Sequence, residues 1–280
     1  MSASARWSRP KRALIAPLVL VAALAVVALA APILSPHDPR VQPDIVALKY
    51  QSPSLSHPFG TDAVSRDVFS RVLYGARVSL TVASISVAVA LLVGTCYGAF
   101  AAFAGGAIDR WLMRALDVLL SLPRVLLLLA VSALWNRPST IWLVLLLGLT
   151  GWYGVARVVR TQMLAQLGRE YVLAAQAAGV RRGRLFTRHL LPHLVPVLAV
   201  YASLGVAHTI GLEAGLSFLG FGVQPPTASW GTIMQEGSSV ASTSWWLTAF
   251  PGFATLIAVV ACNWLGDALR DVFAPEQVPA

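Results

Sequence analysis

The sequence predicts an all-α, polytopic membrane protein with six transmembrane helices. Of its 280 residues, 57% are hydrophobic and only 12% are charged, whereas about a quarter of the residues of a soluble domain are charged. The apolar residues gather in blocks that are each close to the ~20 residues needed to span a bilayer, at residues 13–34, 78–104, 112–134, 139–157, 194–212 and 247–266. Because backbone N–H and C=O groups find no water partner in hydrocarbon, these blocks are predicted to be helices.

The first block is interpreted as a transmembrane anchor helix over residues 13–34, preceded by a basic, cytoplasmic N-terminus at residues 1–12. The triplet Ala-Leu-Ala at residues 28–30 resembles a signal-peptide cleavage site. The block is longer than the apolar core of a usual signal peptide, so we favour an uncleaved anchor. Cleavage near Ala31 is the alternative.

Residues 35–77 are predicted to be an extracytoplasmic segment between the first two blocks. The first part is rich in proline and polar residues, which indicates an extended loop. From Asp62 onward, Val64, Val68 and Val72 recur at helical spacing. This pattern predicts a short amphipathic helix before the second block, lying either at the membrane interface or in solvent.

Residues 78–271 are predicted to form one helical core, and a few charged residues lie inside its apolar blocks. Such residues are rare in membrane spans and are often functional. Arg114 and Asp117 are three residues apart, so we expect a structural ion pair between them. Arg124 follows Pro123 and is expected to face the protein interior or a water-filled cavity, while Glu213 lies at the outer end of the fifth block. Asp117, Arg124 and Glu213 are therefore candidates for a path or gate through the helices, and a position at the water interface is the alternative for Glu213.

The polar connection between the fourth and fifth blocks contains the run REYVLAAQAAGVRRGRLFTRHLLPHLVP at residues 169–196. Good helix formers from Glu170 to Ala178 predict a short helix, and Gly179 is placed to end it. One face is predicted to carry small side chains and one tyrosine, namely Tyr171, Ala174, Ala175 and Ala178. A flat face of this kind in water suits docking against another protein, although the helix could also be a packed elbow of the bundle.

The sequence lacks the common motifs of enzyme active sites. It contains no phosphate-binding loop, no G-x-S-x-G nucleophile elbow and no H-E-x-x-H pair, so we predict no catalytic residue and no enzymatic activity. His189 and His193 are four residues apart, but Pro192 disrupts a regular turn there and no carboxylate or cysteine joins them. No metal and no cofactor bound by this chain are predicted.

The formal net charge of +9 does not indicate a nucleic-acid partner, because the basic residues flank the apolar blocks instead of forming one stripe. Their distribution follows the positive-inside rule if both termini, including the tail at residues 272–280, are cytoplasmic. On that topology the cytoplasmic side carries Arg6, Arg9, Lys11, Arg12, Arg110, Arg114, Arg157, Arg160, Arg169, Arg181, Arg182, Arg184, Arg188 and Arg270. The outer side carries only Arg40, Lys49, Arg66, Arg71, Arg77 and Arg137.

The connection before the fifth block resembles the cytoplasmic coupling loop of ABC importer permeases, in which E-A-A, three residues, G, nine residues and I-x-L-P follow one another. Ala174 and Ala175 match this pattern, Gly179 follows at the right spacing, and Leu191 with Pro192 closes it. Two positions depart from the pattern, because Leu173 replaces the glutamate and His189 replaces the isoleucine. Both departures resemble the dipeptide, oligopeptide and nickel permease family, in which AA…G…RHxLP is common.

Further segments resemble the same family in the expected order. They are HPFGTDAVSRDVFSRVLYGARVSL before the second block, DRWLMRALDVLLSLP in the third, EAGLSFLGFGVQPPTASWG after the fifth and NWLGDALRD near the end. Together they extend over most of the chain from His57 to Asp271. The chain is similar to the C-type inner-membrane subunit of these importers, the second member of a heterodimeric pair.

This resemblance implies a type I ABC importer permease fold in the bacterial cytoplasmic (inner) membrane. The implied partners are a second permease, two cytoplasmic ATPase subunits or domains that bind ATP and Mg, and an extracytoplasmic solute-binding protein. The coupling loop, at about residues 158–193, would include Tyr171, Ala174, Ala175, Gly179, His189, Leu191 and Pro192. Short peptides are the expected substrates.

Other substrates and other classes of transporter stay open at this point. Within the family, the alternatives are nickel chelates, glutathione, haem and opines. Outside it, an ATP-independent channel or secondary transporter is the main competitor. The sequence offers no paired carboxylates within the spans for proton or sodium coupling, which argues against that class.

Overall fold

The computed structural model describes residues 3–134 and 139–273, and the side chains of these residues from Ala13 onward. Arg137 and most of the predicted tail at residues 272–280 lie outside the described residues. The described part of the chain contains twelve helical elements and no β-strand. An isolated antiparallel bridge joins Thr61 and Asp67. The all-α prediction is confirmed.

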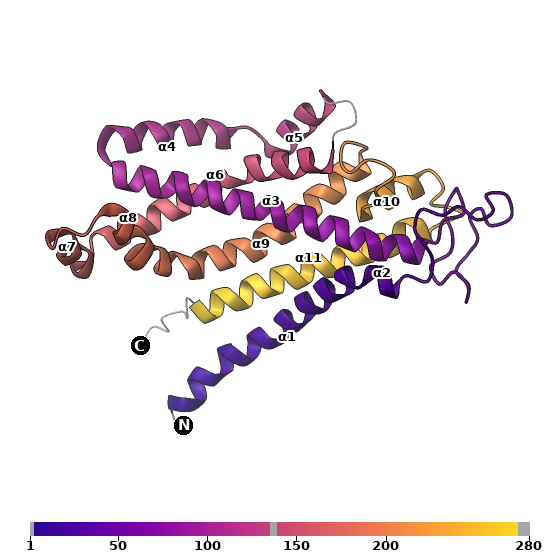
Figure 1. Cartoon of the computed structure of the whole chain (residues 1–280), viewed down its shortest axis with the longest axis horizontal. Coiled ribbons are helices and arrows are strands. Elements are labelled where there is room, and N and C mark those ends of the chain that lie inside the picture. Colours follow the sequence, from indigo (N-terminus) through magenta and orange to yellow (C-terminus); the bar gives the residue numbers. More distant parts are fainter. Residues whose placement is uncertain (1–2, 135–138, 274–280) are drawn as a thin grey trace.

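The elements follow one another with short connections, except for the long segment between α2 and α3 (Figure 1). In chain order they are α1 (Ala3–Leu29), α2 (Ala31–Leu34), α3 (Val68–Ala104), α4 (Gly106–Ser121), α5 (Arg124–Ala133), α6 (Thr140–Leu167), α7 (Glu170–Ala177), α8 (Arg182–Leu185), the π-helix η1 (Phe186–Leu190), α9 (Leu191–Phe218), α10 (Trp230–Ser238) and α11 (Trp246–Phe273).

Four helical runs are long and apolar enough to cross a bilayer, namely α3, α6, α11 and the continuous run Arg182–Phe218. The pair α4 and α5 adds a fifth if it is counted as one span. The described apolar part of α1, Ala13–Leu29, is shorter than these runs. The chain is therefore a multi-pass membrane protein, and the number of six spans stays a prediction.

The third predicted span is not one helix. We predicted a continuous span over residues 112–134, but α4 ends at Ser121 and α5 begins at Arg124, with a bend of 75° between them. The break lies at Leu122 and Pro123, both of which have extended backbone angles. Proline lacks the N–H of a helical hydrogen bond and disfavours helical geometry in the residue before it. The signal for this break was therefore in the sequence.

The predicted separate amphipathic helix after Asp62 is also wrong. The helix α3 begins at Val68 and continues without a break to Ala104, so Val68 and Val72 are buried residues of its first turns. Its N-cap is Asp67, whose carboxylate accepts a hydrogen bond from the backbone N–H of Ser70 at 2.8 Å. This cap starts the helix before the apolar block begins.

Pro192 does not break the helix, but the turn before it is π-helical, so the predicted disruption of a regular turn is found there. Pro192 lies in the first turn of α9, and the π-helical turn η1 joins α8 to α9 directly before it. One continuous helical run from Arg182 to Phe218 results. His189 and His193 thus lie on successive turns of helix, and His193 Nδ1 lies 2.8 Å from the carbonyl oxygen of His189.

The helices α3 and α6 form the centre of the bundle because glycines allow their backbones to approach closely. A Cβ atom at Gly94 would lie 2.7 Å from Val155 Cβ, and one at Gly148 would lie 2.9 Å from Val89 Cβ. Small residues at helix contacts are the usual solution to packing within membranes. These glycines therefore serve the packing of α3 against α6.

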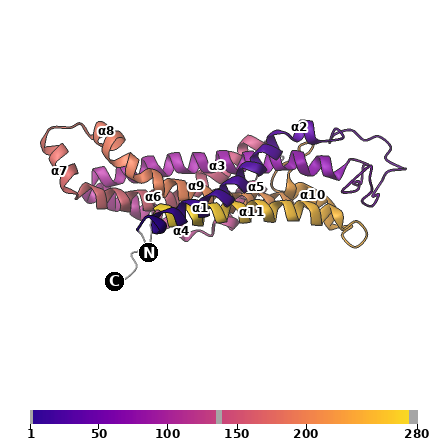
Figure 2. The same cartoon turned by 90° about the horizontal axis from the view of Figure 1, so that it is seen from below.

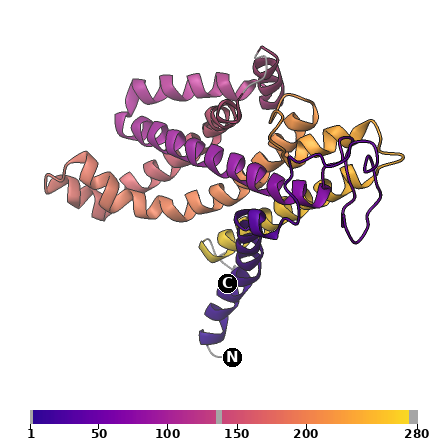
Figure 3. The ribbon, with the colours of Figure 1, turned by 45° about the vertical axis from the view of Figure 1, so that its right-hand side comes forward.

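The two ends of the elongated molecule carry different elements. Figure 1 shows α7 and α8 at one end, and the segment from residue 35 to residue 67 together with α10 at the other end. The separation is equally clear after a turn of 90° (Figure 2). The first residues of α1 and the last of α11 lie in the half that carries α7, and Figure 3 shows α1 leaving the bundle at an angle. The helix α1 contacts α11 and α3.

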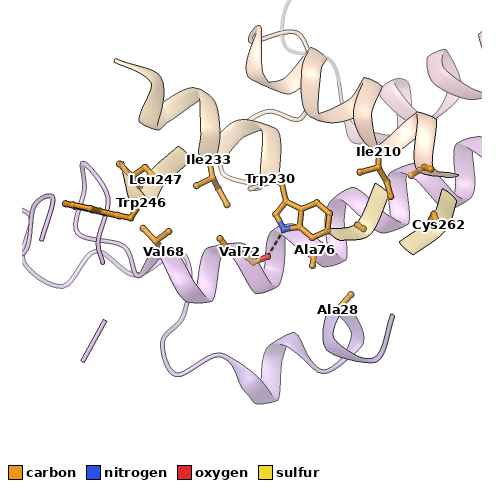
Figure 4. Close-up of a cluster of buried hydrophobic side chains, with 13 residues drawn as sticks. Ala28, Val68, Val72, Ala76, Ile210, Trp230, Ile233, Trp246, Leu247 and Cys262 are labelled. Atoms are coloured by element: carbon orange, nitrogen blue, oxygen red, sulfur yellow. Dashed lines mark hydrogen bonds between the residues drawn. The ribbon is translucent and has the colours of Figure 1, made fainter. Parts of the chain in front are cut away.

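The end with α10 is held by a buried cluster around Trp230. Trp230 is 1% exposed and belongs to one buried cluster with Val72, Ile233 and Leu247 (Figure 4). Its Nε1–H donates a hydrogen bond to the carbonyl oxygen of Val72 at 3.0 Å. The helix α10 was not predicted as an element, and this contact fixes it to α3.

A group of four charges joins the same elements. Arg71 Nη1 lies 2.6 Å from Asp62 Oδ2, and Arg71 Nη2 donates to Glu236 Oε1 at 2.9 Å. Arg66 also pairs with both carboxylates, at 2.6 Å to Asp62 Oδ2 and 3.0 Å to Glu236 Oε2. Because Asp62 and Arg71 are buried, removing one partner would leave an unpaired buried charge. The group therefore ties the segment before α3 to α10.

Candidate functional site

The helix α7 ends as the sequence predicted. Gly179 has a φ of +76°, the left-handed conformation that favours glycine. The N–H of Gly179 donates to the carbonyl oxygen of Gln176 at 2.9 Å, and the N–H of Val180 donates to that of Ala175 at 3.1 Å. This pair of bonds is the Schellman motif, which satisfies carbonyl groups that would otherwise lack partners at the helix end. The chain reverses sharply at Gly179 as a result.

The predicted small-residue face of α7 is divided between two environments. Val172 is fully buried and Ala175 is half-buried against the bundle, because residues three apart lie on one side of a helix. Tyr171, Ala174 and Ala178 point to solvent instead. Ala175 is therefore not part of the same exposed surface as Ala174, which corrects our prediction that all four residues share one face.

The packed side of α7 belongs to a hydrophobic cluster at the end of the bundle. Val172 packs there with Met163 of α6, Leu185 of α8 and Leu190 of η1. Val172 was missed by the sequence analysis, although an apolar residue one turn before Ala175 on an otherwise small-residue helix was a usable signal. The cluster means that α7 is attached to the ends of three helical elements.

Polar contacts hold the edges of the predicted coupling loop. The hydroxyl of Tyr171 lies 2.9 Å from Gln166 Oε1, and its ring is stacked on the ring of His193 at 5.9 Å between centroids. His189 and Leu191 are half-buried, and Pro192 is exposed.

The outward surface of this loop carries apolar side chains beside the exposed Glu170 and Gln176, and it has a basic border. Tyr171 is 41% exposed and Leu173 is 51% exposed, and Ala174 and Ala178 lie beside them on α7. The border consists of exposed arginines at Arg181, Arg182, Arg184 and Arg188. A surface of this composition suits an apolar cleft with acidic residues around it on a partner protein.

Asp117, a candidate for the path, lies on the surface of α4. It pairs with Arg157 of α6, and more than half of each side chain is exposed. Arg114 is not the partner that we predicted from the three-residue spacing. A second pair, not anticipated, joins the same two helices, since Arg160 Nε and Nη2 each lie 2.5 Å from a carboxylate oxygen of Asp109. Both pairs fasten α4 to α6.

Arg124 lies at the start of α5 and borders two cavities, of about 330 Å³ and 360 Å³. Its Nη2 donates to the carbonyl oxygen of Leu147 at 2.8 Å, and its Nε lies 3.4 Å from Thr150 Oγ1. Gly151 leaves room for the guanidinium, because a Cβ there would lie 2.9 Å from Nη2. This placement agrees with the expectation that Arg124 faces a cavity.

Glu213 is buried rather than placed at a water interface. Its exposed fraction is 0%, and its carboxylate accepts hydrogen bonds from Ser79 of α3 and Ser217 of α9, both at 2.7 Å. Ser217 also accepts a bond from the N–H of Val223 at 3.1 Å, which connects the carboxylate to the loop after α9. Glu213 lines none of the cavities described here. The structure thus gives it a position where it joins two helices and a loop.

Three residues outside the predicted sites bring possible metal ligands together. His37, His57 and Asp67 offer ligand atoms that lie within 4.8 Å of one another. The Asp67 carboxylate already accepts bonds from Ser70 as the cap of α3, and it lies 3.0 Å from His57 Nδ1. The cluster therefore acts as support for the start of α3. Sequence reasoning could not find it, because its members are far apart in the chain and share no motif spacing.

Comparisons with known proteins identify the family. A family model described as "binding-protein-dependent transport system inner membrane component" matches residues 94–278. A Brucella suis biovar 1 protein named as a peptide permease is 41% identical over 99% of this chain and 91% of its own length. The dipeptide transport system permease protein DppC of Bacillus subtilis is 38% identical over 96% of this chain and 84% of its own. The oligopeptide transport system permease protein OppC of Haemophilus influenzae is 37% identical over 79% of this chain and 71% of its own.

These matches confirm the resemblance that the sequence motifs carried, from the segment before α3 to the end of α11. They extend through every region in which a site residue was predicted. The chain belongs to the family of binding-protein-dependent transport system inner membrane components.

Proposed function

We propose that this chain is the transmembrane permease subunit of an ATP-driven importer for short peptides. The observation that carries the proposal is the family match together with an exposed apolar surface on α7 at one end of the bundle. The names of the relatives, which refer to peptide, dipeptide and oligopeptide transport, favour peptides over nickel chelates, glutathione, haem or opines.

In the proposed mechanism, α7 is inserted in a cleft of one cytoplasmic ATPase and moves with it. The ATPases bind ATP and Mg and hydrolyse ATP, while this chain supplies the path and the lever. The attachment of Val172 to Met163, Leu185 and Leu190 supports this role. A displacement of α7 is passed to α6 and, through α8 and η1, to α9, because packed apolar side chains transmit force with little compression.

The proposal assigns the other partners to the two ends of the molecule. A second permease completes the path, and a solute-binding protein delivers substrate at the end that carries α10 and residues 35–67. Both termini are then cytoplasmic, on the same side as α7. A group of four charges fixes the shape of the end at which the substrate is delivered. The group consists of Asp62, Arg66, Arg71 and Glu236.

The proposal is tested by transport in proteoliposomes that contain the complete complex and its binding protein. We expect labelled dialanine to accumulate inside the proteoliposomes only when ATP and Mg are present in the compartment that the ATPases face. The same preparation is offered a nickel chelate and glutathione. Uptake of dialanine without ATP would indicate a channel or secondary transporter, and ATP-dependent uptake of another substrate in place of dialanine would contradict the peptide assignment.

A further inference from the structure

Arg124 carries a positive charge in the membrane-spanning part of the bundle without a carboxylate partner among the described residues. It begins α5 at the break in the bent pair α4–α5, and its side chain is half-buried. Of the five N–H donors of a guanidinium, the described part of the chain uses two, which donate to Leu147 and Thr150. The remaining donors are on Nη1 and Nη2, the end of the side chain that borders the cavities.

A purely structural role does not account for this arrangement. Anchoring α5 to the carbonyl oxygen of Leu147 needs a single neutral donor, whereas a charge within a membrane protein is costly and is usually kept for function. The pairs Asp109–Arg160 and Asp117–Arg157 show that this bundle does neutralise other arginines with nearby carboxylates. Arg124 has no such carboxylate among the described residues, and its remaining donors point to an anion that is not part of the described chain.

The larger surroundings of Arg124 are those of a binding site. The cavity of about 330 Å³ lies between α3, α6 and α9 and is lined by Arg124, Ser86, Tyr201, His208 and Thr209 among apolar residues. Cavities of about 300–1,000 Å³ with a few polar groups on apolar walls are typical of small-molecule sites.

His208 adds a second polar group that faces the same space. It lies in the middle of α9, its side chain is exposed, and it lines both this cavity and a neighbouring one shared with Asn263 of α11. Polar side chains exposed halfway along membrane helices face a partner subunit or a water-filled path more often than lipid. Arg124 and His208 therefore mark the side of the bundle on which the path runs.

We propose that Arg124 and His208 hold a carboxylate of the transported substrate as it passes through the bundle. For a peptide this group is the C-terminal carboxylate, which a guanidinium binds through two parallel hydrogen bonds. The inference rests on the proposed function, since it names the place in the path at which the carboxylate of a transported peptide is bound. A lysine would keep the charge but lose the two-pronged geometry.

The test compares uptake of dialanine with uptake of dialanine amide, which lacks the carboxylate. Both are measured in proteoliposomes with the complete complex and one binding protein, so any preference of the binding protein is shared by all variants. We expect Arg124→Gln to lower the acid-to-amide uptake ratio about tenfold relative to the wild type, as the loss of a charge-assisted pair predicts. His208→Asn and Arg124→Lys should lower the ratio by a smaller factor.

Arg157→Gln is the matched control, because Arg157 lies on α6 with an exposed partner and lines none of the cavities described here. The acid-to-amide uptake ratio of this variant should equal that of the wild type. An unchanged ratio in Arg124→Gln overturns the inference while leaving peptide import intact. If Arg124→Gln does not assemble, the ratio in Arg124→Lys decides by the same criterion. A wild-type complex that imports neither compound contradicts the proposed function itself.

Discussion

Gly179 shows how a single backbone conformation sets the shape of the predicted coupling loop. A Cβ atom at this position would meet nothing within 4 Å, so any effect of a substitution comes from the positive φ and not from a clash. The left-handed conformation costs other L-residues roughly 1–2 kcal/mol, and β-branched residues are disfavoured most. The reversal after α7 therefore depends on the residue type at one position.

We predict that Gly179→Val leaves the protein inserted in the membrane but abolishes substrate-stimulated ATP hydrolysis by the complex. The strain should displace the chain at the end of α7 and weaken ATPase association. Gly179→Asn is the control, because asparagine adopts this conformation more readily, and it should retain most of the stimulation. Equal stimulation in the valine variant and the wild type would show that the loop does not depend on this reversal.

Glu213 gives the second prediction at this scale. Glu213→Gln should reduce uptake of peptide while the assembled complex remains intact, because the amide keeps the shape of the side chain but replaces one oxygen acceptor by a nitrogen donor. The new amide nitrogen cannot accept the hydrogen bond that one of Ser79 and Ser217 now donates. Leaving one buried donor without its partner costs about 1–3 kcal/mol.

Uptake at several substrate concentrations and thermal unfolding of the complex check this prediction. Ser217→Ala serves for comparison, since it removes one donor and keeps the carboxylate. If Glu213→Gln lowers thermal stability but leaves uptake unchanged, the residue is only a structural connection between α3, α9 and the following loop. Unchanged uptake and unchanged stability would contradict both roles.

At the scale of elements, α7 has an exposed outer side and a packed inner side. Ala174 is exposed on the outer side, whereas Ala175 is half-buried beside Val172. The two alanines are adjacent in the sequence but lie on different sides of the helix. A substitution at Ala174 therefore tests the role of α7 as a docking surface, and one at Ala175 tests its role as a packed elbow. This division is a sharper test of the coupling role than any single substitution.

We predict that Ala174→Trp abolishes ATPase association without destabilising the permease. A docked contact needs to lose only ~1.4 kcal/mol for its binding constant to fall tenfold. Ala175→Trp should instead lower the thermal stability of the permease, because a large residue in a packed position costs about 1–3 kcal/mol. Co-purification with the ATPases and thermal unfolding in detergent measure the two effects. Normal co-purification of the Ala174 variant would remove α7 from the proposed interface.

Elements were predicted best where one apolar block corresponds to one helix. The end of α3 at Ala104, the helix α7 and most of α11 agree with the sequence prediction. The start of α3 was missed because its first turns carry buried polar groups, such as Ser70 and Arg71, in place of a continuous apolar run. The helix α10 was missed because it depends on the burial of Trp230 and on the capping box at Ser229.

At the scale of the whole molecule, α7 and α10 lie far apart along the longest dimension (Figures 1 and 2). The helix α8, which contains Gly183, lies at one end of the molecule, and α10, which follows the loop that contains Gln224, lies in the opposite half (Figure 1). This separation has a simple consequence for a protein that crosses a membrane, because its two ends then face different compartments.

We predict that reporter fusions near Gly183 and after the last residue report the cytoplasm, and that a fusion near Gln224 reports the outside. The excess of arginine on the side of α7 and α8 is the physical basis. An outside signal at Gly183 would contradict the topology. A mature protein that begins near Ala31 would show that the first block is a cleaved signal, and the spans would have to be counted again.

The sequence by itself determined the class of the protein, the reversal at Gly179 and the family. These properties depend on composition, on local backbone preference and on motif order, all of which can be read along the chain. The partner of Asp117, the buried anchor Val172 and the cavity shared by Arg124 and His208 were decided by tertiary structure. Spacing allowed Asp117 to pair with Arg114, but α6 brings Arg157 closer. Contacts between distant segments depend on how the helices pack, and a local pattern contains no information about which distant side chain arrives first.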